Sequence, residues 1–364
     1  MMPDMSTSYA PTGSTLEFPS ARVATPCFVI FEDRVRHNLS ATVKACGGVH
    51  RLMPHVKTHR APWIVELLLA QGVEAFKCAT PAEVELVLAA GSRHVTWAYP
   101  SANPVAIDRF VRSARNHEDA RLVGLVDSNR GLELWKDALV PAPPNLWLRV
   151  DLDPGMGRTG IAMSDEALNL ARAVHQLGRF AGWHVYDGHI HGERPGRQRQ
   201  VADLAARIAA LQASLRAEGI DGDVIAGGSY TFDLWPRGEV RYVAPGSWTY
   251  SSAEHDSQLA DLNWQPAAFV LATVLSTHDR TATLDAGSKA ISPDKPTAER
   301  FRWERRIVLM SEEHTVVEAD NLSVGDRVYL LPQHACTTAY LYDAALVKTA
   351  EGRWEYRRQL GSAR

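Results

Sequence analysis

Cysteine, basic clusters and long apolar runs are all scarce in this sequence, and each scarcity excludes a class of protein. The four cysteines lie far apart without a CxxC pair, which indicates reduced thiols of a cytoplasmic protein and not a disulfide framework. No apolar run reaches the ~18 residues that a membrane-spanning helix needs. The formal net charge is -3 and no basic run stands out, so we expect neither nucleic acid nor a membrane surface as a partner.

The N-terminal segment lacks the charged start and apolar centre of a signal peptide. Residues 1–24 are therefore predicted to be a flexible tail. No GxGxxG follows an early strand, which argues against a dinucleotide-binding Rossmann domain. The chain has 364 residues and is 45% hydrophobic, which is enough for a barrel and an additional domain.

Strand-like and helix-like stretches alternate over residues 25–252. An extended run at 25–31 precedes a first helix, and a strand is expected at 50–56. Counting from that strand, eight strands are centred near residues 52, 77, 96, 123, 148, 183, 225 and 242. Helical stretches such as 61–71, which ends at Gly72, connect most of them. The pattern predicts a (β/α)8 TIM barrel, with a doubly wound open sheet as the competing fold.

The pattern changes after residue 265, where helical spacing disappears. Short β-like runs, separated by turn residues, occupy 267–275, 281–285, 306–309, 315–318, 326–331 and 345–347. We therefore expect an all-β domain over residues 253–364, after the barrel.

Lys57 stands in the stretch Pro-His-Val-Lys-Thr-His, where the first barrel strand is expected to end. Active groups of such barrels sit at the carboxyl ends of strands. A lysine in a partly dry mouth has a lowered pKa, and its free amine can form a Schiff base with a carbonyl. The alternative is a strand-end lysine that reaches out to water.

Two glycine-serine loops follow the seventh and eighth expected strands. They are Ala-Gly-Gly-Ser-Tyr at 226–230 and Ala-Pro-Gly-Ser at 244–247. Their backbone N–H groups and hydroxyls can bind an anion, and phosphate commonly binds at these two places in a barrel. Each loop alone is ordinary, but together they predict one phosphate site. A reactive lysine across from a phosphate site is what pyridoxal phosphate requires.

Two further strand ends carry polar clusters. After the fifth strand, Asp-Pro-Gly-Met-Gly-Arg-Thr-Gly presents Arg158, whose cation can face the phenolic oxygen of the cofactor or a carboxylate. A structural Asp–Arg pair is the alternative. After the sixth strand, Tyr186, His189 and His191 can contact the cofactor or bind metal, although each can equally be an ordinary polar group.

The expected β domain contains Pro-Gln-His-Ala-Cys-Thr, with His334 and Cys336 two positions apart. On a strand these two side chains face the same side, and imidazole plus thiolate suits zinc. Two ligands are too few for a structural site but suffice for a catalytic site with open positions. The alternative is a chance pair.

Taken together, these motifs resemble the D-threonine aldolase and D-serine dehydratase family, which are fold-type III pyridoxal phosphate enzymes related to alanine racemase. The likeness runs from about residue 25 to 343. It implies that Lys57 is the Schiff-base lysine, and that a divalent metal (zinc, with manganese or magnesium as alternatives) binds His334 and Cys336. It also implies a homodimer in which the β domain caps the partner's barrel. The implied cofactor-binding residues are Lys57, Arg158, Tyr186, Gly228, Ser229, Gly246 and Ser247, with His189 and Tyr230 as further candidates.

The resemblance implies a lyase that acts on β-hydroxy-D-amino acids. Removal of the α-proton, with Lys57 as base, leads to β-elimination of the hydroxyl group, which gives a 2-oxo acid and ammonia. Loss of the hydroxyl proton instead leads to retro-aldol cleavage into glycine and an aldehyde. The His-x-Cys pair resembles the dehydratase branch, whereas aldolases of the family tend to carry His-x-Asp, so we favour elimination. His59 is a second catalytic candidate, and it can also be a metal neighbour or a plain polar group. A racemase and a non-catalytic pyridoxal phosphate carrier are the rival interpretations.

Overall fold

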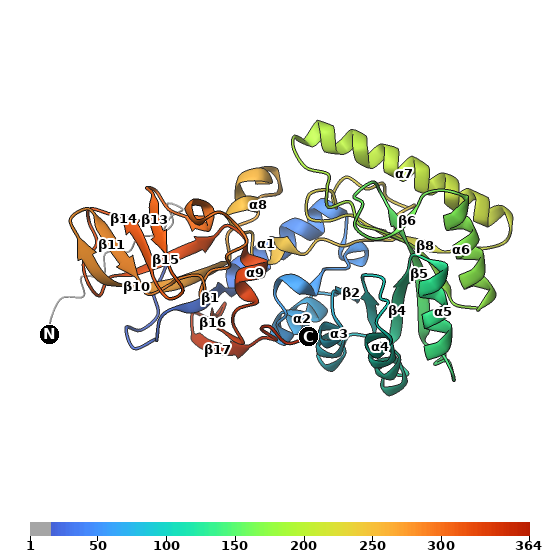
Figure 1. The fold of residues 1–364 in the computed structure, drawn as a ribbon, viewed down its shortest axis with the longest axis horizontal. Helices are drawn as coiled ribbons and strands as arrows, with labels where there is room; N and C mark the ends of the chain where they lie inside the picture. The colour runs from blue at the N-terminus through green and yellow to red at the C-terminus, as the bar shows by residue number, and fades with distance from the viewer. Residues whose placement is uncertain (1–15) are drawn as a thin grey trace. The chain divides into compact units, whose positions relative to one another are not determined.

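The computed structural model describes residues 16–364, which form two compact units (Figure 1). The barrel unit contains Thr42–Lys57, Ala61–Gly246 and Arg364. The β unit contains the described residues up to Ala41, together with Thr58–Arg60 and Ser247–Ala363.

A parallel sheet organises the barrel unit. Its strands run in the order β2-β3-β4-β5-β7-β8-β9, with the short β6 beside β5. The strands are β2 (Ala75–Cys78), β3 (His94–Trp97), β4 (Arg121–Val126), β5 (Leu146–Asp153), β6 (Ile161–Ala162), β7 (Phe180–Val185), β8 (Asp223–Ala226) and β9 (Tyr242–Val243). Seven of the eight predicted strands are therefore confirmed as strands.

The remaining predicted strand, the first of the eight at residues 50–56, is wrong as a regular strand. This segment consists of two 3₁₀ turns, η1 (Val49–Arg51) and η2 (Val56–Thr58), with four residues between them. Pro54 has no N–H and so cannot donate to a strand ladder. The segment still closes the barrel, because Met53 N donates to Val243 O at 2.9 Å and Lys77 N donates to Pro54 O at 3.0 Å. That closure excludes the competing open sheet.

Helices connect the parallel strands where local sequence signals place them. Proline occupies the first positions of α2, α3 and α4, where its missing N–H costs nothing. Side chains that accept a backbone N–H begin four helices, and these are Thr80, Asn103, Ser128 and Ser164. The helices are α2 (Pro62–Ala70), α3 (Pro81–Ala89), α4 (Pro104–Asn116), α5 (Asn129–Ala138), α6 (Asp165–Gln176) and α7 (Arg194–Ala217).

The β unit is built on a largely antiparallel sheet, which confirms the predicted C-terminal β domain, although that domain is not all-β because it also contains short helices. Its strands are β1 (Cys27–Phe31), β10 (Ala268–His278), β11 (Thr281–Leu284), β12 (Phe301–Arg302), β13 (Ile307–Met310), β14 (Thr315–Glu318), β15 (Arg327–Pro332), β16 (Ala344–Lys348) and β17 (Trp354–Arg358). Short helical segments lie between some of them, namely η3 (Ser247–Thr249), α8 (Ala253–Gln258), η4 (Ala260–Leu262), η5 (Thr297–Glu299) and α9 (Ala335–Ala339).

The first strand differs from the expectation that residue 25 begins the barrel. β1 pairs antiparallel with β10 and parallel with β16, so it lies inside the β unit. Helix α1 (Glu32–Cys46) follows it. All five residues of β1 are apolar, so it suits the buried centre of a sheet, and only tertiary pairing decides which sheet. The predicted domain ranges themselves, 25–252 and 253–364, remain predictions.

The predicted flexible tail is corrected where it is described. Leu16 is 6% exposed, the ring of Phe18 stacks on Tyr329 at 4.6 Å between centroids, and the Tyr329 hydroxyl donates to Glu17 O at 2.9 Å. Two apolar side chains at alternate positions pack this segment onto the β unit. Residues 1–15 of the predicted tail lie outside the described residues.

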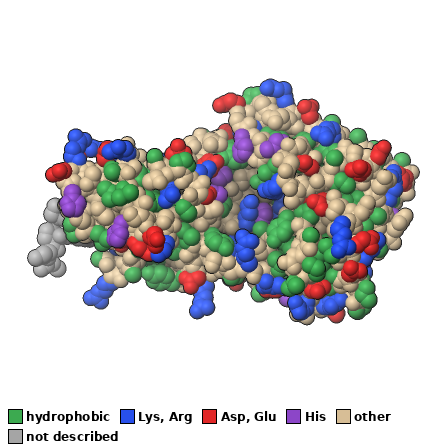
Figure 2. Space-filling model, in the orientation of Figure 1, with side chains coloured by type: hydrophobic (Ala, Val, Ile, Leu, Met, Phe, Trp, Pro, Cys, Tyr) green, Lys and Arg blue, Asp and Glu red, His purple; other side chains and the backbone are tan. Residues whose placement is uncertain are grey.

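The visible surface mixes both signs of charge. Figure 2 shows Lys and Arg side chains interspersed with Asp and Glu side chains on that face. Within residues 16–364, no helix combines the length and apolarity needed to cross a membrane.

Candidate active site

Lys57 lies in the η2 turn, directly after the segment that closes the barrel. Its backbone N–H donates to His55 Nδ1 at 3.3 Å. The backbone of His55 forms an isolated parallel β-bridge with Lys77 of β2. The segment before Lys57 is not a strand, so the predicted position at the carboxyl end of a strand is wrong, although Lys57 does follow the segment that closes the barrel. The expectation of a partly dry lysine is wrong, because the turn carries the Lys57 side chain to an exposed position.

The ring of Tyr186, just after β7, collects groups from several strand ends. Lys57 Nζ lies 5.7 Å from the ring centroid, Lys77 Nζ 5.4 Å and Arg158 Cζ 4.7 Å. A Cβ on Gly228 would lie 3.1 Å from the same ring, so glycine permits this close approach. Four predicted site residues thus gather at the ring of Tyr186, together with Lys77, which was not predicted from the sequence.

The loop after β5 is folded around a carboxylate. Asp153 Oδ1 accepts the backbone N–H groups of Gly155, Met156 and Gly157 at 2.9, 2.8 and 3.1 Å. Gly160 N donates to Asp127 Oδ2 at 3.1 Å. Carboxylate acceptors near both ends of the glycine-rich loop therefore hold it in a tight turn.

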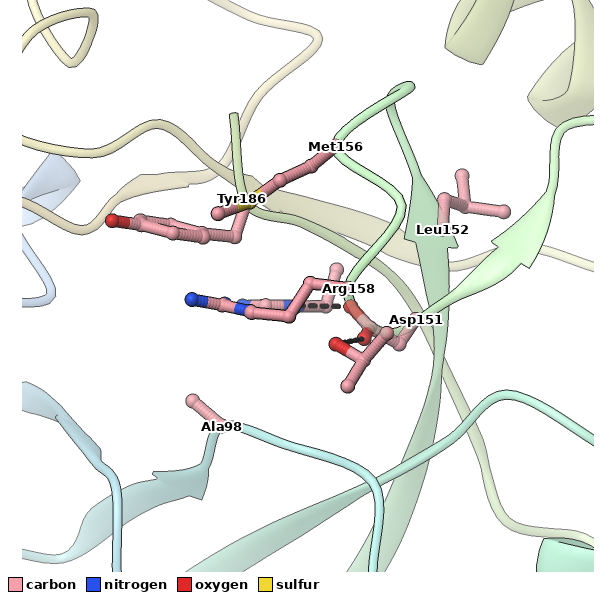
Figure 3. Close-up of a pocket in the computed structure, with 8 residues that line it drawn as sticks. Ala98, Asp151, Leu152, Met156, Arg158 and Tyr186 are labelled. Atoms are coloured by element: carbon pink, nitrogen blue, oxygen red, sulfur yellow. Dashed lines mark hydrogen bonds and ion pairs between the residues drawn. The ribbon is translucent and has the colours of Figure 1, made fainter. Parts of the chain in front are cut away.

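Arg158 points from this loop alongside Tyr186 (Figure 3). In the described part of the chain it forms no ion pair, so the alternative of a structural Asp–Arg pair is wrong. The side chain borders a small pocket. The pocket is lined by Ala98, Asp151, Leu152, Met156, Arg158, Thr159, His184 and Tyr186.

A buried histidine–aspartate pair forms one wall of this pocket. His184 Nδ1 and Asp151 Oδ1 are 2.6 Å apart, and Thr159 Oγ1 donates to Asp151 Oδ2 at 3.2 Å. Burial, and next the charge of Lys77, lower the pKa of His184 to about 4, against the opposing effect of Asp151. This pair was not predicted from the sequence, although charged or titratable residues among the apolar residues of both strands were the available signal.

The two glycine-serine loops approach one another in the barrel unit. Gly246 N donates to Ser229 Oγ at 3.4 Å, and Gly228 N donates to Asp187 Oδ1 at 3.0 Å. Ser247 begins η3 and belongs to the β unit. These groups fit pyridoxal phosphate. The amine of Lys57 suits its aldehyde, the guanidinium of Arg158 suits its phenolic oxygen, and the close glycine loop at Gly228 suits its phosphate, beside the ring of Tyr186.

The remaining predicted residues have different surroundings. His189 is exposed and makes no hydrogen bond, ion pair or ring contact with any described residue. The ring of Tyr230 meets His191 edge-on at 4.4 Å between centroids. His59 is 1% exposed and belongs to the β unit. None of these contacts joins the cluster at Tyr186.

His334 and Cys336 lie close together in the β unit, but not on a strand. β15 ends at Pro332, His334 precedes α9, and Cys336 lies inside that helix. The strand-based reason for pairing them is therefore wrong. The side chains still meet, since they share a hydrogen bond that contributes to the pKa of His334. Cys336 Sγ also donates to Thr58 Oγ1 at 3.3 Å.

Asp294 is a third member of this cluster that the sequence analysis missed. Its carboxylate contacts His334 Nδ1. Burial alone lowers the pKa of His334, but Cys336 and Asp294 outweigh it and raise the pKa to about 9. Across residues 16–364, no three His, Cys, Asp or Glu side chains are arranged to hold a metal ion. The pair itself, with a carboxylate on the second ring nitrogen, has the donor chemistry of an open zinc-type site.

Both parts of this chain match known protein families. Residues 30–254 match the family described as "Alanine racemase, N-terminal domain", and residues 267–348 match "Putative serine dehydratase domain". A D-threonine aldolase from Arthrobacter sp is 31% identical over 360 residues, covering 93% of each chain. A D-threo-3-hydroxyaspartate dehydratase from Delftia sp. (strain HT23) is 27% identical over 372 residues, covering 91% of this chain and 96% of that one.

Solved structures agree with these matches. The D-threonine aldolase from Filomicrobium marinum superposes with a TM-score of 0.84 at 26% identity, covering 96% of this chain and 98% of that one. A cysteine-to-alanine mutant of the D-threo-3-hydroxyaspartate dehydratase, described as the metal-free form, superposes with a TM-score of 0.79 at 22% identity, covering 93% and 98%.

The fold and these matches define a class of enzyme with an alanine racemase-like barrel and a β-rich C-terminal part. The chain belongs to the family in this class that includes D-threonine aldolase and D-threo-3-hydroxyaspartate dehydratase, which confirms the resemblance seen in the sequence. It is a pyridoxal phosphate-dependent lyase of the D-threonine aldolase type.

Proposed function

We propose that this lyase uses pyridoxal phosphate and a divalent metal to act on β-hydroxy-D-amino acids, eliminating the β-hydroxyl to release a 2-oxo acid and ammonia. The observation that carries the elimination is the pairing of His334 with Cys336. The dehydratase from Delftia sp. (strain HT23), 27% identical over 372 residues, supports elimination as the outcome. Residues 267–348, which contain the pair, match the serine dehydratase domain family.

The residues around Tyr186 supply binding and proton transfer. Lys57 is exposed, so its amine is accessible to a carbonyl and, once displaced, can accept the α-proton of the substrate. Arg158 and the Gly228 loop hold acidic oxygens of the ligand. Pyridoxal phosphate, when bound, supplies an electron sink for the charge that develops at the α-carbon.

In the β unit, Asp294 fixes the orientation of the imidazole. Because its carboxylate engages Nδ1 of His334, Nε2 is the ring nitrogen left for a cation. Cys336 adds a soft sulfur ligand, which favours zinc over magnesium. A divalent metal, when bound, supplies a Lewis acid toward the substrate hydroxyl.

Retro-aldol cleavage to glycine and an aldehyde is the second candidate. It is supported by the 31% identity to the D-threonine aldolase over 93% of the chain. The same residues serve both outcomes, and the placement of the base relative to the hydroxyl decides between them. The homodimer, the catalytic role of His59 and a cytoplasmic location remain predictions from the sequence.

Product analysis with D-threonine tests the proposal. We expect ammonia and 2-oxobutanoate from the wild type with zinc or manganese, and their loss with Cys336→Ala. The matched control is Cys27→Ala, another free cysteine of the β unit, which should keep the activity.

Each other product assigns a different function. Glycine and acetaldehyde would establish the aldolase instead. L-allo-Threonine, produced equally by wild type and Cys336→Ala, would identify a racemase that inverts the α-carbon. Bound pyridoxal phosphate without any product would identify a carrier.

A further inference from the structure

Lys77 is a buried cation that the proposed chemistry does not yet use. Its side chain in β2 is 2% exposed, and Nζ lies 5.4 Å from the centroid of Tyr186. In the part of the chain that the structure describes, this ammonium makes no hydrogen bond and no ion pair. Burying an ammonium without such a partner is costly, so its presence points to a ligand.

The charges around Lys77 are unbalanced. Lys57 and Arg158 approach the same ring, so three cations gather there. The carboxylates that act on Lys77 are Asp151 and Asp187. Three positive side chains therefore face two carboxylates, which leaves one positive charge in excess.

Both carboxylates are already engaged by other donors. Asp151 accepts from His184 at 2.6 Å and from Thr159 at 3.2 Å. Asp187 accepts from a backbone N–H and from the indole of Trp235, each at 3.0 Å. Neither carboxylate accepts a hydrogen bond from Lys77, so the ammonium of Lys77 can still bind an additional anion.

Electrostatics agree with this assignment. Burial, and next the charge of Lys57, lower the pKa of Lys77 to about 7, with Arg158 adding to the effect and Asp151 and Asp187 opposing it. His184 also faces Lys77, and its own pKa is lowered to about 4, so it carries no charge near neutral pH. An anion placed beside Lys77 would stabilise the charged amine, so binding and protonation favour each other.

We propose that Lys77 is a further ligand-binding residue of this site, and that its ammonium, with Arg158, receives an acidic oxygen of the carbonyl compound that Lys57 captures. This inference rests on the proposed function. Such an oxygen has two sources, the phenolic oxygen next to the aldehyde of pyridoxal phosphate and the carboxylate of the amino-acid substrate. The glycine-serine loops remain for the phosphate.

The test compares Lys77→Met with Lys44→Met, which removes an exposed lysine from the last turn of α1. The probes are pyridoxal phosphate and its 3-O-methyl ether, which lacks the acidic hydroxyl. Dissociation constants come from the absorbance of the bound chromophore. We expect Lys77→Met to weaken pyridoxal phosphate by about 10- to 100-fold and the ether by less than about twofold, as for one charge-assisted hydrogen bond. Equal weakening of both probes would mean a structural role and would overturn the inference.

A second arm titrates the loaded proteins with D-alanine, which has no β-hydroxyl to lose. If Lys77→Met binds both probes normally but needs about 10- to 100-fold more D-alanine for the same absorbance change, the substrate carboxylate is the source. If neither arm distinguishes Lys77→Met from wild type, this inference alone fails. If wild type itself takes up no pyridoxal phosphate, the proposed function fails and this inference fails with it.

Discussion

Lys57 and Lys77 approach the same ring of Tyr186, but they differ in exposure. The residues next to Lys57 in the sequence mark it as a site residue. The buried environment that was expected for Lys57 is found at Lys77 instead. Lys77 stands in a four-residue strand beside Phe76 and Cys78, and nothing in that local pattern marks it. Its burial is a property of the closed barrel and not of its neighbours in the chain.

The buried state of Lys77 predicts a pH-dependent stability. Its pKa falls from 10.5 to about 7 on folding, mainly through burial, so between these values the unfolded chain binds more protons at this residue. The contribution of Lys77 to the free energy of unfolding is therefore fully present above pH 10.5 and is lost as the pH falls through about 7. Lys77→Met should lack this dependence, so the variant should gain stability relative to wild type between about pH 10 and pH 7.

Urea denaturation of the protein without cofactor at several pH values measures this difference. Lys44→Met, which removes an exposed lysine, should follow wild type at every pH. If the free energies of unfolding of wild type and Lys77→Met differ by the same amount at every pH, Lys77 is not a buried amine with a lowered pKa.

At the scale of elements, the loop between β5 and α6 decides where Arg158 points. Gly160 has a φ of 102°, and a Cβ there would lie 2.5 Å from Asp153 N. Gly155 has a φ of 105° in the same loop, but a Cβ there would meet nothing within 4 Å. Both glycines therefore have a backbone conformation that residues with a side chain rarely adopt, and only Gly160 also lacks space for a side chain.

Gly160→Ala should lower the free energy of unfolding more than Gly155→Ala does. We expect about 1 kcal/mol from the positive φ in both variants and about 1–3 kcal/mol more from the clash at Gly160. Urea denaturation measures both. Pyridoxal phosphate should also bind more weakly to Gly160→Ala, because the displaced loop carries Arg158. Equal destabilisation of the two variants would show that the loop adapts to the added methyl group.

At the scale of the whole molecule, the cluster at Tyr186 and the His334–Cys336 pair belong to different compact units. Lys57, Tyr186 and Arg158 lie in the barrel unit, whereas His334 and Cys336 lie in the β unit. Each unit has its own buried core and its own hydrogen-bonded sheet. A group bound by one unit can therefore be removed without dismantling the donors in the other.

Metal removal should separate these two parts. On the proposed function, a chelator should abolish lyase activity on D-threonine, while the absorbance of pyridoxal phosphate at Lys57 stays unchanged. Added zinc or manganese should restore activity without a new absorbance change. Parallel loss of absorbance and activity would mean that the metal maintains the barrel site, and full activity with the chelator would argue against the metal.

The sequence alone predicted most elements of the fold. Seven of the eight barrel strands and the main β-like runs follow from hydrophobic periodicity, and prolines and capping side chains mark the helix starts. It also identified Lys57, Arg158, Tyr186 and Gly228, which the structure brings to one ring. These features are local, because a strand end or a glycine-rich turn is encoded within a few residues.

What only the tertiary structure decided involves residues far apart in the chain. β1 joined the sheet of the β unit through pairing with β10 and β16. Asp294 met His334 across a separation of 40 residues, and His184 met Asp151 across 33. Lys77 became buried because the chain closed a barrel around it. The sequence determines which side chains are available at each strand end, whereas their partners and exposure depend on the closure of the sheets, which no local pattern encodes.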